Sequence, residues 1–116
     1  MSNSTITINV SLDPQKVPEQ ITWSATQSTA DEERKAKAVM LAFWDGNDKA
    51  ALRMDLWTKD MMVDEMGDFY YQTLMTMADS FERATHNQEL VHKLKHFAQD
   101  FYKEFRAKLM EENKIQ

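Results

Sequence analysis

This chain of 116 residues contains no cysteine, two prolines and two glycines. Without cysteine it can form neither disulfides nor thiolate zinc sites, which is typical of proteins in a reducing compartment. No apolar run approaches the roughly 20 residues that a membrane span requires. The first five residues lack the basic and apolar regions of a signal peptide. We therefore expect a cytoplasmic protein without a membrane span.

Motifs for catalysis are also lacking. The sequence contains no nucleophile elbow, no phosphate-binding loop and no metal signature. The net charge of −5 argues against nucleic acid, which selects clustered basic residues. Hydrophobic residues make up 42% of the chain and charged residues 28%, which is ordinary for a globular protein. We expect one domain over residues 1–116, with no enzymatic activity and no cofactor.

The first half of the chain alternates between apolar and polar residues with the period of a strand. Four strands are expected, at residues 5–12, 21–26, 38–44 and 51–57; three of them alternate in this way, and the one at 38–44 is nearly continuously apolar. Asp45-Gly46 with Asn47-Asp48 is a strong hairpin signal between the last two. Short connections between successive strands predict a four-stranded antiparallel meander, at about residues 4–57.

The third predicted strand is apolar on both faces. Val39, Leu41 and Phe43 share one face, and the helices are expected to cover it. The other face would carry Met40 and Trp44, joined by Trp57 of the fourth strand. An apolar patch rimmed by polar groups is typical of a contact surface, so a protein partner or self-association is one interpretation. The other is that the polar loop of residues 27–34 covers this face.

The second half of the chain has the 3.6-residue period of two amphipathic helices, at about residues 63–84 and 88–111. The short connection makes them antiparallel neighbours, with Asn87 as the N-cap of the second. The stripe of Met66, Tyr70, Met77 and Phe81 is expected to be core. The predicted fold class is therefore α+β, with both helices packed on one face of the sheet.

His92, His96 and Asp100 recur at four-residue steps and so share one face of the second helix. Two imidazoles and a carboxylate could hold a metal, but the glutamate of an HExxH motif is absent and this face is expected to be solvated. A ligand pocket between sheet and helices, lined by Met and aromatic residues, is a further alternative. Paired acids could do acid–base chemistry, but nothing in the sequence brings Asp55 and Asp79 together.

Several blocks of the sequence resemble one known family. They are VPEQITWSA at residues 17–25, KAVMLAFWD at 37–45, LWTKDM at 56–61, VDEM at 63–66 and MADSFERAT at 77–85. Together they are similar to the gliding motility-associated protein GldC family of Bacteroidetes. The resemblance implies an accessory protein of a motility system that acts through protein–protein contacts, and it supplies no catalytic residues.

Overall fold

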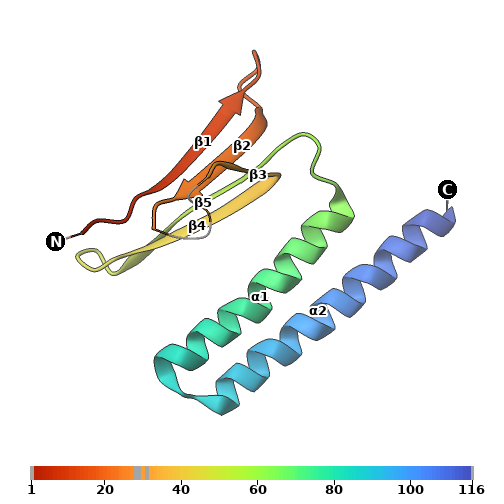
Figure 1. The fold of residues 1–116 in the computed structure, drawn as a ribbon. Coiled ribbons are helices and arrows are strands. Elements are labelled where there is room, and N and C mark those ends of the chain that lie inside the picture. Colours follow the sequence, from red (N-terminus) through yellow and green to blue (C-terminus); the bar gives the residue numbers. More distant parts are fainter. Residues whose placement is uncertain (1, 28–29, 31, 116) are drawn as a thin grey trace. The chain divides into compact units, whose positions relative to one another are not determined.

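The computed structural model describes residues 2–27, 30 and 32–115, with the side chains of 113–115 not described. The chain forms two compact units, Met1–Met61 and Met62–Gln116, and each is described by itself. The first holds all the strands and the second holds both helices (Figure 1). The elements are β1 (Ile6–Leu12), β2 (Pro18–Ala25), β3 (Arg34–Ala36), β4 (Ala38–Asp45), β5 (Ala50–Trp57), α1 (Val63–Thr85) and α2 (Gln88–Ile115). The α+β class is therefore confirmed.

Strands β1, β2 and β3 form an antiparallel sheet in that order. Ile21, at the centre of β2, is only 1% exposed and is the largest fully buried side chain among the described residues. A tight connection joins β1 to β2, where the Asp13 carboxylate accepts hydrogen bonds from the backbone N–H groups of Gln15 and Val17 at 2.8 and 2.9 Å. This side-chain cap holds the left-handed turn at Lys16, whose φ is 65°.

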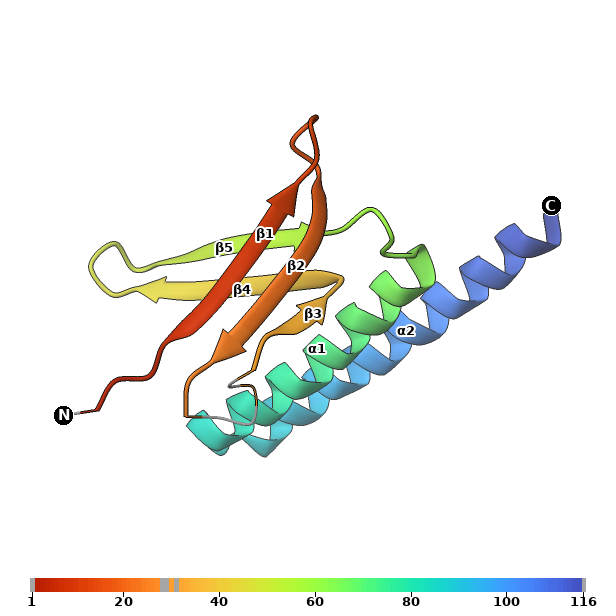
Figure 2. The same cartoon turned by 45° about the horizontal axis from the view of Figure 1, so that its top comes forward.

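The prediction of a single four-stranded sheet is wrong, because the strands form two sheets, β1-β2-β3 and β4-β5. The strand expected at 38–44 is present as β4, but a short strand that was not predicted, β3, precedes it. The chain bends at Lys37 between them, so that β3 pairs with β2 whereas β4 pairs with β5 (Figure 2). Thr58 fixes this bend, since its N–H and its hydroxyl both donate to the Lys37 carbonyl, at 2.8 and 3.1 Å. A bent strand of this kind lets one chain segment serve two sheets.

The predicted β4–β5 hairpin is confirmed. Its strands pair from Ala38↔Trp57 to Asp45↔Ala50. In the turn, the Asp45 carboxylate accepts from the N–H groups of Asn47 and Asp48, at 2.9 and 3.2 Å. The turn closes because an aspartate side chain can replace backbone partners at such a position.

Both helices begin where the periodicity predicts, and α2 continues beyond the predicted end at residue 111 to Ile115. Asn87 is the predicted N-cap of α2, because its side-chain oxygen accepts from the Leu90 N–H at 3.2 Å. His86, with φ of 56°, ends α1 in the left-handed conformation. No helix of the described part of the chain is long and apolar enough to cross a bilayer.

The stripe of α1 that was expected to be core does not form the seam with α2, and its packing against the sheet stays a prediction. Tyr70, Met77 and Phe81 are 43%, 49% and 39% exposed, whereas Gly67 and Ala78 are buried. The buried stripe lies about one residue further round the helix, against α2, whose buried positions are Val91 and Ala98. Small residues permit the two helix backbones to approach, so the seam selects them over the larger apolar side chains.

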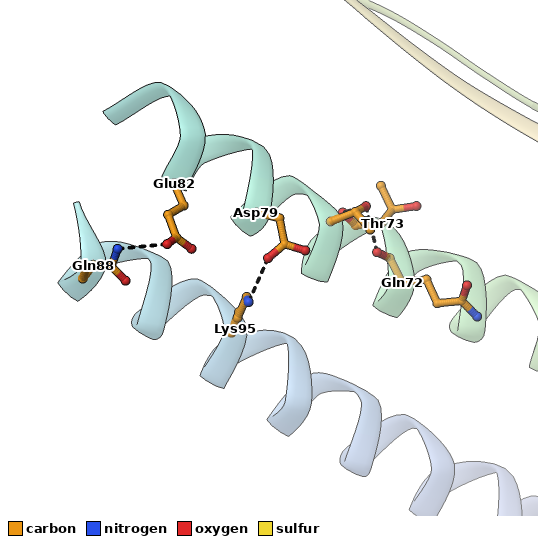
Figure 3. A network of polar contacts seen from close by, with 7 residues as sticks. Gln72, Thr73, Asp79, Glu82, Gln88 and Lys95 are labelled. Atoms are coloured by element: carbon orange, nitrogen blue, oxygen red, sulfur yellow. Dashed lines mark hydrogen bonds and ion pairs between the residues drawn. The ribbon is translucent and has the colours of Figure 1, made fainter. Parts of the chain in front are cut away.

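Polar contacts along one side tie the two helices together. Lys95 of α2 binds Asp79 of α1 at 2.8 Å, and Gln88 donates to Glu82 at 2.9 Å (Figure 3). Tyr102 donates its hydroxyl hydrogen to Asp68 at 2.7 Å. The hydrogen bond to Asp79 raises the pKa of Lys95, and the hydrogen bond to Asp68 raises the pKa of Tyr102. The packing of the helices on one face of a sheet, and the single-domain organisation, stay predictions.

Candidate functional site

The register of the β4–β5 hairpin assigns every side chain to one of two faces, because directly paired residues of antiparallel strands point to the same side. We name these the tryptophan face and the leucine face. The tryptophan face consists of Ala38, Met40, Ala42, Trp44, Ala51, Arg53, Asp55 and Trp57. The leucine face carries Val39, Leu41, Phe43, Leu52, Met54 and Leu56. The register thus places Met40, Trp44 and Trp57 on the same face.

Large apolar side chains are exposed on both faces of this hairpin. On the tryptophan face, Trp44 is 69% exposed and Trp57 55%, while Met40 is half-buried. On the leucine face, Phe43 and Leu52 near the turn are 63% and 56% exposed. Such side chains lose little conformational entropy on burial and are usual anchors of protein contacts.

The two tryptophans lie at opposite ends of the tryptophan face. Trp44 pairs with Ala51 near the turn, and Trp57 pairs with Ala38 at the far end. The six positions between Ala38 and Trp44 correspond to about 20 Å along a strand. An ion pair occupies the space between them, since Arg53 binds Asp55 at 2.8 Å. One hairpin therefore presents two separate aromatic anchors with a charged centre.

The loop that was predicted as a possible cover for this face is only partly described. Residues 28, 29 and 31 lie outside the described residues. Ala30 is 4% exposed, and its carbonyl accepts from the Ala25 N–H at 2.7 Å, which fixes it beside the end of β2. Arg34, expected in this loop, instead begins β3. Cover of the tryptophan face by the loop stays a prediction.

A polar cluster that the sequence reasoning missed joins the β1–β2 turn to the segment after β5. Asp13 is 7% exposed and binds Lys59 as well as the two turn N–H groups. The hydrogen bond from Lys59 is the main cause that lowers the pKa of Asp13, and the same bond raises the pKa of Lys59. Next to it, the single hydrogen of the Thr58 hydroxyl is shared between the Lys37 carbonyl and the Asp60 carboxylate, and the hydrogen bond to Asp60 lowers the pKa of Asp60. These groups bond to one another and so have a structural role. In the sequence, the polar run Thr58-Lys59-Asp60 was the signal from which the cluster could have been predicted.

The candidate metal residues lie along an open hollow on α2. Its lining residues all come from this one helix: Gln88, Glu89, His92, Lys93, His96, Phe97 and Asp100. His96 approaches Asp100 through Nδ1 at 3.4 Å. In the part of the chain that the structure describes, no group of three or more His, Cys, Asp or Glu side chains is arranged to hold a metal ion. The geometry therefore gives the metal interpretation no support.

The two isolated carboxylates, Asp55 and Asp79, belong to different units, and each has its own basic partner, Arg53 and Lys95 respectively. Each carboxylate is thus occupied by a basic neighbour of its own unit. Neither carboxylate stands beside a nucleophile in the described contacts.

Comparison with known proteins agrees with the resemblance that the sequence blocks carry. The family model described as gliding motility-associated protein GldC-like matches residues 18–107 of this chain. The match begins at β2 and runs through the β4–β5 hairpin, all of α1 and most of α2. Searches of curated proteins and of solved structures gave no match. Because the matched segment covers well over half of the 116 residues, the chain belongs to the GldC-like family of gliding motility-associated proteins.

Proposed function

We propose that this chain is a non-enzymatic accessory protein of the gliding-motility system, working in the cytoplasm through protein–protein contacts. The tryptophan face of the β4–β5 hairpin is the proposed contact surface, with Met40, Trp44 and Trp57 as its anchors. The single observation that carries the proposal is the exposure of two tryptophans, 69% and 55%, on one face of a regular hairpin.

The energetics support a partner for this face. A tryptophan buries about 150–250 Å² when fully enclosed. At about 25 cal/mol per Å², the area of Trp44 that remains exposed is worth about 3–4 kcal/mol before the costs of association. Two such anchors with Met40 are sufficient for the hot spot of a specific interface.

The bonding of the polar side chains supports a function that is not enzymatic. Asp13 binds a lysine and two backbone amides, and Asp68 accepts from a tyrosine. A catalytic acid or base needs access to a substrate, whereas these groups are occupied by neighbours in their own unit. The family description adds association with motility and names no reaction.

The test is complementation of a strain from which the gene has been deleted. Cells receive the parent protein, Trp44→Ala, Met40→Asp or the control Lys49→Ala, which changes an exposed residue in the turn of the same hairpin. We expect the first two variants to accumulate normally and fail to restore gliding, while the control restores it. Full gliding with both Trp44→Ala and Met40→Asp would refute the proposal.

A stability measurement separates contact from cover. Should the tryptophan face pack under its own chain, Trp44→Ala would lower the thermal midpoint of the purified protein by many degrees. The proposal expects a thermal midpoint close to that of the parent, because the side chain is largely in solvent before a partner binds.

A further inference from the structure

The outer edge of β5 is a second feature that the hairpin leaves open. Among the described residues β5 pairs only with β4, so the N–H and C=O groups on its other side have no strand partner. The strand is eight residues long and contains no proline, which would remove a backbone donor from such an edge. Its residues Ala51 to Asp55 are all exposed. A strand edge of this kind is a template for a further strand.

We propose that β5 pairs antiparallel with β5 of a second copy of this chain, around a two-fold axis at Met54. Alternate residues of a strand point to opposite faces, so in a symmetric antiparallel pair an odd-numbered residue must face an odd-numbered one, and an even-numbered residue an even-numbered one. The numbers of two facing residues therefore always add up to the same even number. The axis at Met54 places Arg53 opposite the partner's Asp55. The symmetry repeats this pair, so both charges of each strand find opposite charges across the interface.

The same register is complementary on the leucine face. Met54 meets the partner's Met54, and Leu52 meets the partner's Leu56, with Leu41 and Phe43 of β4 continuing the rows. Two hairpins thereby become one four-stranded antiparallel sheet with an uninterrupted apolar face. Isolated two-stranded hairpins are marginally stable in water, and sheets of four strands are not.

Pairing also unites the two aromatic anchors that one chain holds about 20 Å apart. Ala51 already pairs with Trp44 in its own hairpin. In the proposed register Ala51 faces the partner's Trp57 on its other side. The result is a row of Trp44, Ala51 and the partner's Trp57 across three strands. The two indoles are then separated by two strand spacings, or about 10 Å, with the small side chain of Ala51 between them. Two chains would then build the contact surface of the proposed function together. This shared surface rests on the proposed function, whereas the pairing of the two β5 strands does not.

Strand β4 is the weaker candidate for this pairing. Its only charged residue, Asp45, already accepts hydrogen bonds from the N–H groups of Asn47 and Asp48 in the turn. The outer edge of β4 also runs directly into the bend at Lys37 that leads to β3. The Arg53–Asp55 arrangement, which specifies a register, exists only on β5.

Engineered cysteines test the register, because the chain has none of its own. Met54→Cys places one thiol opposite itself across the axis, where facing Cα atoms of antiparallel strands lie about 4.5–5.5 Å apart, within disulfide range. Leu52→Cys is the matched control on the same strand and face. Its two copies would be four positions, or about 13 Å, apart and cannot join.

Charge variants test the same register independently. Arg53→Glu sets like charges opposite each other twice and should weaken self-association about tenfold or more. Exchanging both residues, Arg53→Asp with Asp55→Arg, restores two opposite-charge pairs and should restore association. Lys49→Glu makes the same change in charge outside the paired strand and should leave association unchanged.

The readouts are sedimentation velocity over a range of concentrations and the yield of disulfide-linked dimer under mild oxidation. Support requires a concentration-dependent dimer of the parent, cross-linking at residue 54 and none at residue 52. A parent that stays monomeric at the highest concentration, or equal cross-linking at both positions, overturns the pairing. These measurements do not involve motility, so their failure leaves the proposed function standing, and a failed complementation test leaves the pairing standing.

Discussion

Gly67→Ala is the substitution whose effect the structure defines most sharply. Gly67 is buried in the α1–α2 seam, and an added Cβ would overlap three carbons of the Phe105 ring. Alanine is favoured over glycine inside a helix by about 1 kcal/mol. Overpacking a filled contact costs about 1–3 kcal/mol, so the two terms oppose each other. We expect a net loss of about 0–2 kcal/mol in the free energy of unfolding.

The double-mutant cycle with Phe105→Ala makes the argument decisive. Without the ring, the three atoms nearest to the alanine methyl group are gone, and the gain in helix propensity is expected to dominate. Gly67→Ala should therefore raise the free energy of unfolding by about 1 kcal/mol in the Phe105→Ala background. The sign of one substitution thus reverses with the residue opposite it, which corresponds to a coupling of about 1–3 kcal/mol.

Urea unfolding followed by circular dichroism measures all four proteins of this cycle. Gly46→Ala is the control, since a Cβ at that turn position has no heavy atom within 4 Å. The same stabilisation by Gly67→Ala in both backgrounds would refute the close approach of the helices at this position.

Four further predictions follow from single contacts. Asp13→Asn should lower the thermal midpoint at neutral pH. The folded state lowers the pKa of Asp13, so the stability that its carboxylate contributes is full above the ordinary value of 3.8 and is lost as the pH falls through the lowered pKa. The thermal midpoint of the variant should therefore fall less in acid than that of the parent. The folded state raises the pKa of Tyr102, so the stability that its hydroxyl contributes is full below the ordinary value of 10.0 and is lost as the pH rises through the raised pKa. Tyr102→Phe should therefore flatten the alkaline limb of a plot of thermal midpoint against pH. Asn87→Ala removes the N-cap of α2 and should cost about 0.5–2 kcal/mol in urea unfolding, whereas a cost near zero would contradict the capping bond. Replacing both His92 and His96 by alanine should leave the thermal midpoint unchanged with or without added zinc; a midpoint that zinc raises in the parent alone would revive the metal interpretation.

Local signals allowed much of the fold to be predicted from the sequence. Period-two alternation located β1, β2 and β5, a nearly continuous apolar run located β4, and the Asp-Gly dipeptide located the hairpin turn. The second helix begins where Asn87 predicts it, because a capping bond joins residues only three apart. Such features depend on neighbouring residues, and the sequence displays them directly.

The division into two sheets could not be predicted in the same way. The bend at Lys37 depends on Thr58, which is 21 residues away and donates to the Lys37 carbonyl through two groups. Strand β3 was not predicted, since only one of its three residues is apolar, and the strand that follows the bend is the one expected at 38–44. The same holds for Asp13, whose partner Lys59 is distant in the sequence.

The α1 seam shows a different limit. Two apolar stripes lie side by side on this helix, one with Tyr70, Met77 and Phe81 and the other with Gly67 and Ala78. Periodicity identifies both, and hydrophobicity favours the larger side chains. At the seam, the close approach of α2 selects the smaller ones, and this depends on a second helix rather than on α1 itself.

For the candidate site, the sequence predicted which residues share a face but not how far apart they lie. The register confirms that Met40, Trp44 and Trp57 are on one side of the hairpin. Their separation along the strands follows from the pairing of Ala38 with Trp57, which only the structure gives. The ion pair of Arg53 with Asp55 in the middle of that face was likewise apparent only from the structure.

The central claim is that the tryptophan face contacts another protein chain in gliding cells. Site-specific photocross-linking tests it directly, with a photoreactive amino acid at position 44 or 57 and, as the control, at the exposed turn position 48 of the same hairpin. We expect illumination to link positions 44 and 57, and not position 48, to a second protein chain, which mass spectrometry then identifies. Absence of any cross-linked species at 44 and 57, or the same species at 48, would contradict it.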